Sequence, residues 1–262
     1  MKRAAVLGSP IAHSLSPNLH RAAYAALGLD WSYEAIEVGE AELRPFLAQL
    51  DQTWAGLSLT MPLKEAAIEI CASVEITAMN IRSVNTLLPG DDGWTGTNTD
   101  ITGIVRSLEE IGLEFGLESA LILGAGATAR SGIAALAQMG VGSVGVSARR
   151  PEQIAELLEL AATFMISAHA VPWEPNAESL QVSLVLSSLP GDVGLPWAQA
   201  AGSTTAALLD VAYHPWPTPL AAAWPTSQIA SGRSMLLWQA AEQVRLMTGL
   251  EPPVEAMRAS LN

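Results

Sequence analysis

The sequence predicts a protein of the α/β class with two domains, and three observations support this expectation. The chain has 262 residues, of which 50% are hydrophobic and 15% are charged, a composition typical of a folded protein of one or two domains. Short strand-like runs alternate with helix-like segments, the pattern of βαβ units and parallel sheets. The alternation falls into two series that divide near residue 100.

The first series begins with a strand over residues 4–8. Ser16-Pro17 has the sequence of a helix N-cap followed by proline at the first helical position, and Gly28 is expected to end that helix. Two runs that flank the turn from Pro89 to Gly93 predict a hairpin over 83–88 and 94–97. The other elements expected here are strands at 33–38 and 54–59 and helices at 40–50, 63–72, 74–80 and 100–111.

The second series continues the alternation from Ser119 onward. Its expected strands cover residues 120–123, 143–147, 168–171, 182–186 and 206–211. Its expected helices cover residues 127–139, 151–162 and 234–248. Gly249 and Pro252-Pro253 should end the last of these helices.

Composition narrows the partners and the compartment. Thirteen Lys and Arg against 26 Asp and Glu give a net charge of −13, which indicates against nucleic acid as a partner. No stretch is apolar over the ~18 residues of a membrane helix, and residues 1–8 resemble a first strand more than an export signal. The single cysteine, Cys71, indicates a reducing compartment, so we expect a cytoplasmic protein. Four scattered histidines and this cysteine predict no metal site.

A glycine turn in the second series has the spacing G-x-G-x-x-A between a strand and a helix. Gly124 allows the tight turn, and Gly126 lets the backbone approach a pyrophosphate. Ala129 is small enough for the helix to pack on the strand, while Ala125 and Ala127 complete the turn. Free N–H groups at the helix start would bind an anion. The motif predicts a Rossmann-type dinucleotide-binding domain.

The end of the next strand indicates which dinucleotide is bound. Proteins that bind NAD usually place Asp or Glu there to hold the ribose 2′-hydroxyl. This chain instead has Ala148-Arg149-Arg150, and guanidinium groups bind a phosphate through paired hydrogen bonds. We therefore predict NADP as the cofactor.

Polar residues follow the expected strands of the first series in three places. Each has an ordinary structural interpretation: a helix N-cap, a solvated lysine and turn chemistry. Lys64, however, is one of only two lysines, and with Asp100 it would form an ion pair suited to proton transfer. The three places are Ser14 with Ser16, Thr60 with Lys64, and Asn85-Thr86 with the later run Asn98-Thr99-Asp100.

The joint order of these motifs resembles the shikimate dehydrogenase family over nearly the whole chain. The resemblance implies reversible NADPH-dependent reduction of 3-dehydroshikimate to shikimate, a step of aromatic amino acid and chorismate biosynthesis. It also implies a substrate-binding domain over 1–100, an NADP-binding domain over 101–235, and C-terminal helices over 236–262 that pack on the first domain. The matching motifs are S-x-S-P-x-x-H, T-x-P-x-K, V-N-T, N-T-D-x-x-G, G-A-G, Asp210-Val211-Ala212-Tyr213-His214-Pro215, and Gly232-Arg233-Ser234-Met235-Leu236 with Gln239.

The resemblance also implies roles for individual residues. Lys64 and Asp100 would be the catalytic pair. Carboxylate binding falls to Ser14, Ser16 and Tyr213, ring-hydroxyl binding to Thr60, Asn85 and Gln239, and cofactor binding to the glycine turn, Arg149, Arg150, Gly232 and Met235. Met235 would pack near the nicotinamide. Family members occur as monomers and dimers.

The chain departs from the family pattern at several positions. Ala127 stands where the family often has glycine, Arg150 where it often has a threonine, and Arg82-Ser83 where Gly-Ala is usual. Two alternative functions stay open: a quinate/shikimate dehydrogenase that uses NAD or both cofactors, and a regulatory protein that binds NADP without turnover. Quinate users often carry a Thr at the second serine position, so the paired serines favour shikimate.

Overall fold

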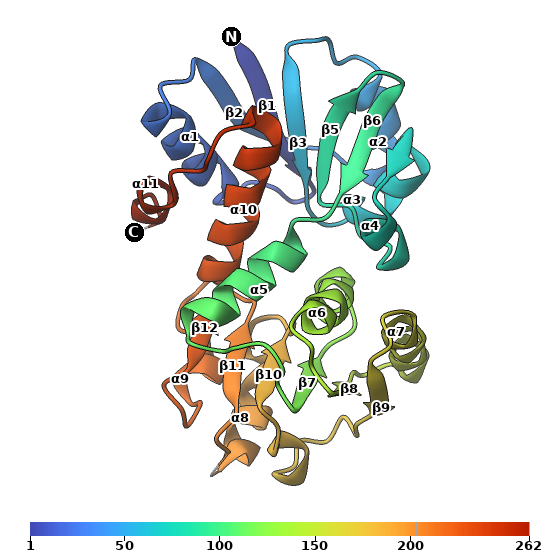
Figure 1. Ribbon diagram of the computed structural model, residues 1–262, viewed down its shortest axis with the longest axis vertical. Helices are drawn as coiled ribbons and strands as arrows, with labels where there is room; N and C mark the ends of the chain where they lie inside the picture. The colour runs from blue at the N-terminus through green and yellow to red at the C-terminus, as the bar shows by residue number, and fades with distance from the viewer. Residues whose placement is uncertain (203, 262) are drawn as a thin grey trace. The chain divides into compact units, whose positions relative to one another are not determined.

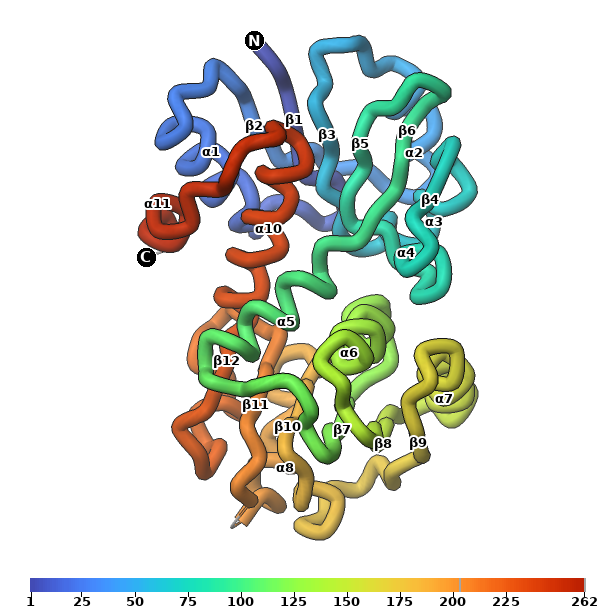
Figure 2. The backbone as a smooth tube through the Cα atoms, in the orientation of Figure 1, coloured from blue at the N-terminus to red at the C-terminus, as the bar shows by residue number. Residues whose placement is uncertain are grey.

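The fold is described from a computed structural model of the chain (Figures 1 and 2). The structure describes residues 1–202 and 204–261, so Ser203 and Asn262 lie outside the described part of the two expected domains. The chain forms two compact units, Met1–Gly103 with Leu236–Asn262, and Ile104–Met235. Each unit contains a six-stranded sheet.

The sheet of the first unit has the strand order β2-β1-β3-β5-β6-β4. Strand β1 pairs in parallel with β2 and β3, whereas β3–β5 and β5–β6 are antiparallel pairs. Short β4 runs parallel to β6. The elements are β1 (Lys2–Gly8), α1 (Ser16–Ala26), β2 (Trp31–Glu37), α2 (Glu40–Leu47), β3 (Trp54–Leu59), α3 (Leu63–Ala66), β4 (Ser73–Val74), α4 (Ile76–Asn80), β5 (Thr86–Gly90), β6 (Gly93–Thr97) and α5 (Asp100–Glu110), with a 3-10 turn at Ala67–Glu69.

Alternation along the buried strand β1 places apolar side chains in two layers, one on each face of the sheet. Ala4 and Val6 join a core cluster with residues of α1, α10 and α11, while Ala5 and Leu7 join a cluster with residues of α2 and α3. Helices α1 and α11 lie side by side, as Figure 2 shows. The C-terminal helices thus cover one face of the first sheet.

All neighbouring strands of the second sheet are parallel, in the order β12-β11-β10-β7-β8-β9. Counted from β7, this is the order 3-2-1-4-5-6 of the doubly wound dinucleotide-binding fold. The elements are β7 (Ser119–Leu123), α6 (Ala127–Gln138), β8 (Ser143–Ser147), α7 (Pro151–Thr163), β9 (Ser167–Ala170), β10 (Leu184–Ser187), α8 (Leu195–Ala201), β11 (Ala207–Asp210), α9 (Pro219–Ala222), β12 (Ile229–Ser231), α10 (Gly232–Thr248) and α11 (Val254–Ala259), with 3-10 turns at Glu178–Leu180 and Gly191–Gly194.

Most expected strands and long helices are confirmed within a few residues, but the segment from 63 to 80 differs. Helix α3 spans only Leu63–Ala66, because a 3-10 turn follows and Ser73–Val74 then pairs with β6. Pairing with a distant strand overrides the local helical preference of residues 70–75.

The expected N-cap at Ser16 is also wrong: Ser16 is the first helical residue, and Leu15 occupies the cap without a side-chain hydrogen bond.

Candidate functional site

The carboxyl ends of β1 and β3 lie next to each other and position the turn that leads to Lys64. Thr60 N–H donates to the Leu7 carbonyl at 2.9 Å, and Leu63 N–H donates back to the Thr60 carbonyl at 2.8 Å. A Cβ added to Gly8 would lie 2.4 Å from Thr60 Cγ2, so the close approach of these strand ends requires glycine there. The proline turn then starts α3, whose second residue is Lys64.

The predicted ion pair between Lys64 and Asp100 is present. Lys64 Nζ lies 2.5 Å from Asp100 Oδ2, and the two side chains are 17% and 6% exposed. Asp100 is the first residue of α5, where the helix dipole stabilises a carboxylate. Asn85 Nδ2 donates to the other oxygen, Asp100 Oδ1, at 2.8 Å. The ammonium is therefore held on one oxygen of an oriented carboxylate, an arrangement suited to proton transfer.

Asn85 is the centre of this cluster and is 1% exposed. Its backbone lies between two strands, since Leu59 N–H donates to the Asn85 carbonyl at 2.7 Å and Asn85 N–H donates to the Thr97 carbonyl at 3.1 Å. Thr99 N–H donates to Asn85 Oδ1 at 2.8 Å, and Gln239 Oε1 lies 3.5 Å from Asn85 Nδ2. The structure thus brings together four predicted site residues: Lys64, Asn85, Asp100 and Gln239.

Ser14 and Ser16 lie at the entry to α1, in the same unit as this cluster. Ser16 N–H donates to Ser14 Oγ at 3.4 Å, and Ser16 is 6% exposed. Ser14 Oγ thus accepts the N–H of the first helical residue, whereas the Ser16 hydroxyl does not cap the helix, so the N-cap interpretation fails for Ser16. A role for both hydroxyls in binding a ligand stays a prediction.

Arg82 occupies a backbone conformation that favours glycine. Its φ is 48°, in the left-handed region that costs a side-chain-bearing residue about 1–2 kcal/mol. The guanidinium pairs with Glu65 at 2.5 Å, although both side chains are well exposed. Where the sequence departs from Gly-Ala, Arg82 therefore adopts a backbone conformation that glycine favours, at the cost of local strain.

The glycine turn of the second unit follows β7 and leads into α6, as predicted. Gly124 has a φ of 101°, and a Cβ there would lie 2.4 Å from Ser188 Oγ. Gly126 is the N-cap of α6 with a φ of −85°, and a Cβ there would meet no atom within 4 Å. Neither strain nor crowding within the chain requires glycine at this position. The open space beside it fits a group that approaches the backbone from outside, as a pyrophosphate would.

Arg149 and Arg150 are exposed at the end of β8, the strand next to β7. Arg150 is the N-cap residue of α7, and its Nε donates to Gln153 Oε1 at 2.9 Å. Ala129 is fully buried, in agreement with its expected packing role. The two arginines therefore follow the carboxyl end of β8, the place where an arginine accommodates a 2′-phosphate in this type of fold.

Three further predicted residues lie toward the other edge of the same sheet. Tyr213 follows β11, and burial raises the pKa of its phenol above the ordinary value. A Cβ added to Gly232 would lie 2.1 Å from the Val211 carbonyl oxygen, so close packing by itself requires glycine there. Met235 is 7% exposed. The cofactor contacts expected of Gly232 and Met235 stay predictions.

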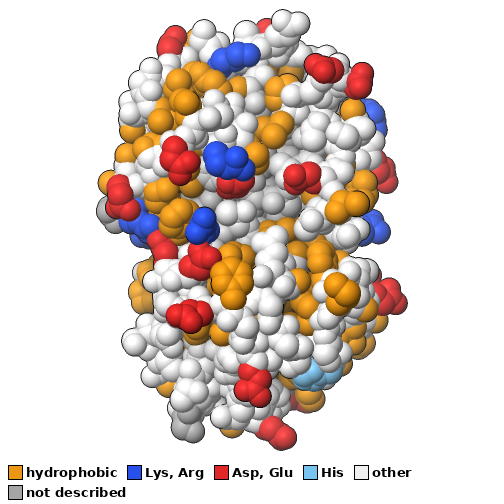
Figure 3. All heavy atoms as spheres, viewed as in Figure 1, with side chains coloured by type: hydrophobic (Ala, Val, Ile, Leu, Met, Phe, Trp, Pro, Cys, Tyr) orange, Lys and Arg blue, Asp and Glu red, His pale blue; other side chains and the backbone are white. Residues whose placement is uncertain are grey.

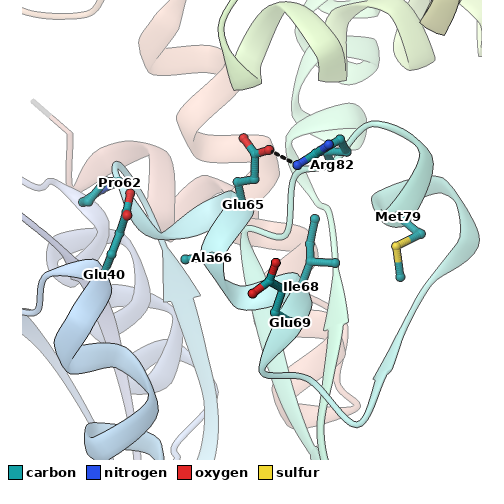
Figure 4. A pocket seen from close by; sticks show the side chains of 8 residues that line it. All are labelled: Glu40, Pro62, Glu65, Ala66, Ile68, Glu69, Met79 and Arg82. Atoms are coloured by element: carbon teal, nitrogen blue, oxygen red, sulfur yellow. Dashed lines mark ion pairs between the residues drawn. The ribbon is translucent and has the colours of Figure 1, made fainter.

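A cavity of about 600 Å³ lies on α3, but it is separate from the Lys64 cluster. Figure 4 shows Glu65 and Arg82 paired across it, with Met79 of α4 opposite. Its described lining includes neither Lys64 nor Asp100; it consists of Glu40, Pro62, Glu65, Ala66, Ile68, Glu69, Met79 and Arg82. We do not assign the candidate site to this cavity.

On the face drawn in Figure 3, Lys and Arg side chains stand dispersed among Asp and Glu. Within residues 1–202 and 204–261, no three His, Cys, Asp or Glu side chains are grouped as metal ligands. The same described part of the chain contains no helix that is long and apolar enough to cross a membrane.

The sequence assigns no role to three buried polar residues behind Asn85: Ser58, Thr86 and Gln243. Gln243 hydrogen-bonds Thr86 Oγ1 at 2.9 Å and Ser58 Oγ at 2.8 Å. One signal was available, because Gln243 lies four residues after Gln239 and therefore on the same side of a helix. Two glutamines with this spacing on a packed helix indicate a buried polar contact.

Comparison with known protein families gives two matches. The model of the shikimate dehydrogenase substrate binding domain matches residues 6–87. The model of the shikimate 5'-dehydrogenase C-terminal domain matches residues 232–261.

Individual relatives match over nearly the full length. The shikimate dehydrogenase (NADP(+)) of Synechococcus sp. (strain JA-2-3B'a(2-13)) is 36% identical, over 97% of this chain and 92% of the relative. The crystal structure of Mycobacterium tuberculosis shikimate dehydrogenase has a TM-score of 0.92 and 40% identity, and covers 100% of this chain and 98% of that one. Shikimate 5-dehydrogenase of Thermus thermophilus, crystallised with NADP(H) and shikimate, has a TM-score of 0.85 and 34% identity, with 99% and 98% covered.

Proposed function

The chain belongs to the shikimate dehydrogenase family, and we propose that it catalyses the reversible NADPH-dependent reduction of 3-dehydroshikimate to shikimate. The observation that carries the proposal is the Lys64–Asp100 pair at 2.5 Å, oriented by Asn85 within the first unit. A relative with this overall fold binds NADP(H) and shikimate. The first unit would bind the substrate and the second unit the cofactor.

The proposed catalytic role of Lys64 is to move a proton at the reacting oxygen. In the reductive direction, the carbonyl oxygen of the substrate gains a proton from the ammonium as the carbon gains a hydride. In the oxidative direction, the neutral amine takes the proton back from the hydroxyl. Asp100 would hold Nζ in position, while Asn85 would hold Asp100. NADPH supplies the hydride when bound.

The residues of the second unit fit a dinucleotide phosphate. The open backbone at Gly126 and the start of α6 would hold the pyrophosphate. Arg149 and Arg150 would bind the 2′-phosphate, which NAD lacks. Ser14, Ser16 and Tyr213 are the proposed carboxylate ligands of the substrate. Thr60 and Gln239 are proposed to bind ring hydroxyls.

The experiment that tests the function is steady-state reduction of NADP⁺ with shikimate or quinate, repeated with NAD⁺. We expect turnover with shikimate and NADP⁺ and much lower kcat/KM for the other three pairs. Comparable rates with quinate or NAD⁺ would support a broader quinate/shikimate dehydrogenase. NADP⁺ binding without any turnover would overturn the proposal in favour of a regulatory protein.

Replacing Lys64 tests the proposed chemistry. Lys64→Ala should lower kcat by about 10²–10⁴-fold with a much smaller change in KM, because a positioned proton-transfer group is lost. The matched control is Lys2→Ala, at the only other lysine, whose Nζ donates to the Gln52 carbonyl on the surface. Near-normal turnover of the Lys64 variant would remove this residue from the mechanism.

Replacing the arginines tests the cofactor preference. Arg149→Ala and Arg150→Ala should each raise the KM for NADP⁺ while leaving the KM for NAD⁺ unchanged, because the arginines would contact only the additional phosphate. Equal effects on both cofactors would contradict the assignment.

The proposed assembly is a monomer or homodimer, which sedimentation at several concentrations would test. The proposed location is the cytoplasm.

A further inference from the structure

The carboxamide of Gln243 is completely hydrogen-bonded inside the first unit. Gln243 is 1% exposed. Its Oε1 accepts from Ser58 Oγ at 2.8 Å and lies 3.2 Å from His20 Nε2. Its Nε2 donates to Thr86 Oγ1 at 2.9 Å and to the Asn85 carbonyl at 3.3 Å. A carbonyl oxygen can only accept, so the amino group of the carboxamide must face Asn85.

This orientation determines the direction of the hydrogen bonds that follow. Because Thr86 Oγ1 accepts from Gln243, its own hydrogen is directed to Asn85 Oδ1, at 2.8 Å. The same Asn85 oxygen accepts the Thr99 N–H at 2.8 Å. With Oδ1 occupied by two donors, the Asn85 amino group faces Asp100 Oδ1, also at 2.8 Å. A flipped Asn85 would turn its amino group toward the two donors and its carbonyl oxygen toward the Asp100 carboxylate, so these hydrogen bonds would be lost.

We propose that Gln243 is a positioning residue for the dehydrogenase reaction. It sets the direction of the Thr86 hydroxyl hydrogen. That hydroxyl holds the Asn85 carboxamide in the orientation that keeps Asp100 beside Lys64. Gln243 itself has no hydrogen-bonding capacity left for a substrate and is too buried to reach one. This inference rests on the proposed function, because its readout is the rate of that reaction.

The test replaces each member of the chain of hydrogen bonds. Gln243→Met keeps the volume but loses both donors, and we expect kcat to fall about tenfold or more, with KM changed less than about threefold. Thr86→Val should have a similar effect, whereas Thr86→Ser, which keeps the hydroxyl, should restore kcat to near the wild-type value. The double variant should be no slower than the slower single variant, since both changes interrupt one path.

Tyr33→Phe is the matched control for a loss of stability alone. Tyr33 Oη donates to Ser58 Oγ at 2.6 Å. This hydrogen bond belongs to the same buried network but lies at the end that is farther from Asn85. This variant also loses a buried hydrogen bond but leaves both donors of Gln243 in place. We expect a lower melting temperature and an unchanged kcat.

Four outcomes would overturn the inference. These are an unchanged kcat in Gln243→Met, an unchanged kcat in Thr86→Val, multiplicative effects in the double variant, or an equal loss of kcat in Tyr33→Phe. If Gln243→Met does not fold, an unchanged kcat in Thr86→Val would still overturn the inference. A wild-type protein without shikimate oxidation would instead refute the proposed function, so the two failures are distinguishable.

Discussion

Burial of His20 predicts that the first unit loses stability as the pH falls. His20 is 0% exposed, and its ring stacks on Tyr33 with centroids 3.9 Å apart. Loss of hydration lowers the pKa of His20 to about 3, although a hydrogen bond to Gln243 opposes this shift. In the unfolded chain the ring has an ordinary pKa near 6.5. Between these two pKa values, His20 therefore binds a proton in the unfolded state but not in the folded state.

The sign and size of the effect follow from this difference. A base with a depressed folded pKa destabilises the fold below its unfolded pKa, so stability is lost as pH falls from about 6.5 toward 3. Each pH unit well inside that window costs about 1.4 kcal/mol. Between pH 7 and pH 5 the contribution of His20 is about 2 kcal/mol, a sizeable part of the 5–15 kcal/mol that is typical of a protein.

The assay is urea unfolding of the wild type and His20→Phe at pH 7 and pH 5. Phenylalanine keeps a ring against Tyr33 but cannot bind a proton. We expect the variant to be less stable at pH 7, yet to lose about 2 kcal/mol less than the wild type on going to pH 5. His13→Gln, at an exposed histidine, should keep the wild-type pH dependence. Equal losses in wild type and His20→Phe would refute the reasoning.

The remaining predictions concern four backbone positions. Met165 follows α7 with a φ of 59° and is 94% exposed, so Met165→Gly should raise the free energy of unfolding by about 1 kcal/mol. Gly140→Ala, at the equivalent position after α6 with a φ of 70°, should lower it by about as much in the same urea titration. Gly126→Ala should lower the free energy of unfolding by about 1 kcal/mol or less, because alanine is a poorer N-cap than glycine. It should also weaken NADP⁺ binding in calorimetry, because the added Cβ would occupy the open space proposed for the pyrophosphate. Gly124→Ala should also lower the free energy of unfolding, since φ is 101° and the added Cβ would lie 2.4 Å from Ser188 Oγ. Unchanged NADP⁺ affinity in Gly126→Ala would contradict the proposed pyrophosphate contact.

Features that depend on neighbouring residues could be predicted well. The turn from Gly124 to Ala129 lies between one strand and one helix, so its spacing alone predicted its structure. The hairpin of β5 and β6 was predicted for the same reason, because its turn residues and strands are adjacent in the chain. Lys64 and Asp100 were paired correctly because both follow strands whose ends face one edge of a sheet.

Other contacts between distant residues, unlike the Lys64–Asp100 pair, could not be predicted from local patterns. Residues 73–74 form a strand only because β6 offers free backbone groups to pair with. Gln243 lies 157 residues after Thr86, and its role depends on how α10 packs on the first sheet.

The sequence by itself determined the two α/β series, the glycine turn and the residue types of the site, since periodicity and turn chemistry act over a few residues. Tertiary structure alone decided which polar groups meet behind Asn85 and in which direction each hydrogen bond runs. The physical reason is that a buried donor or acceptor must find a partner wherever packing places one, and that partner can come from any part of the chain.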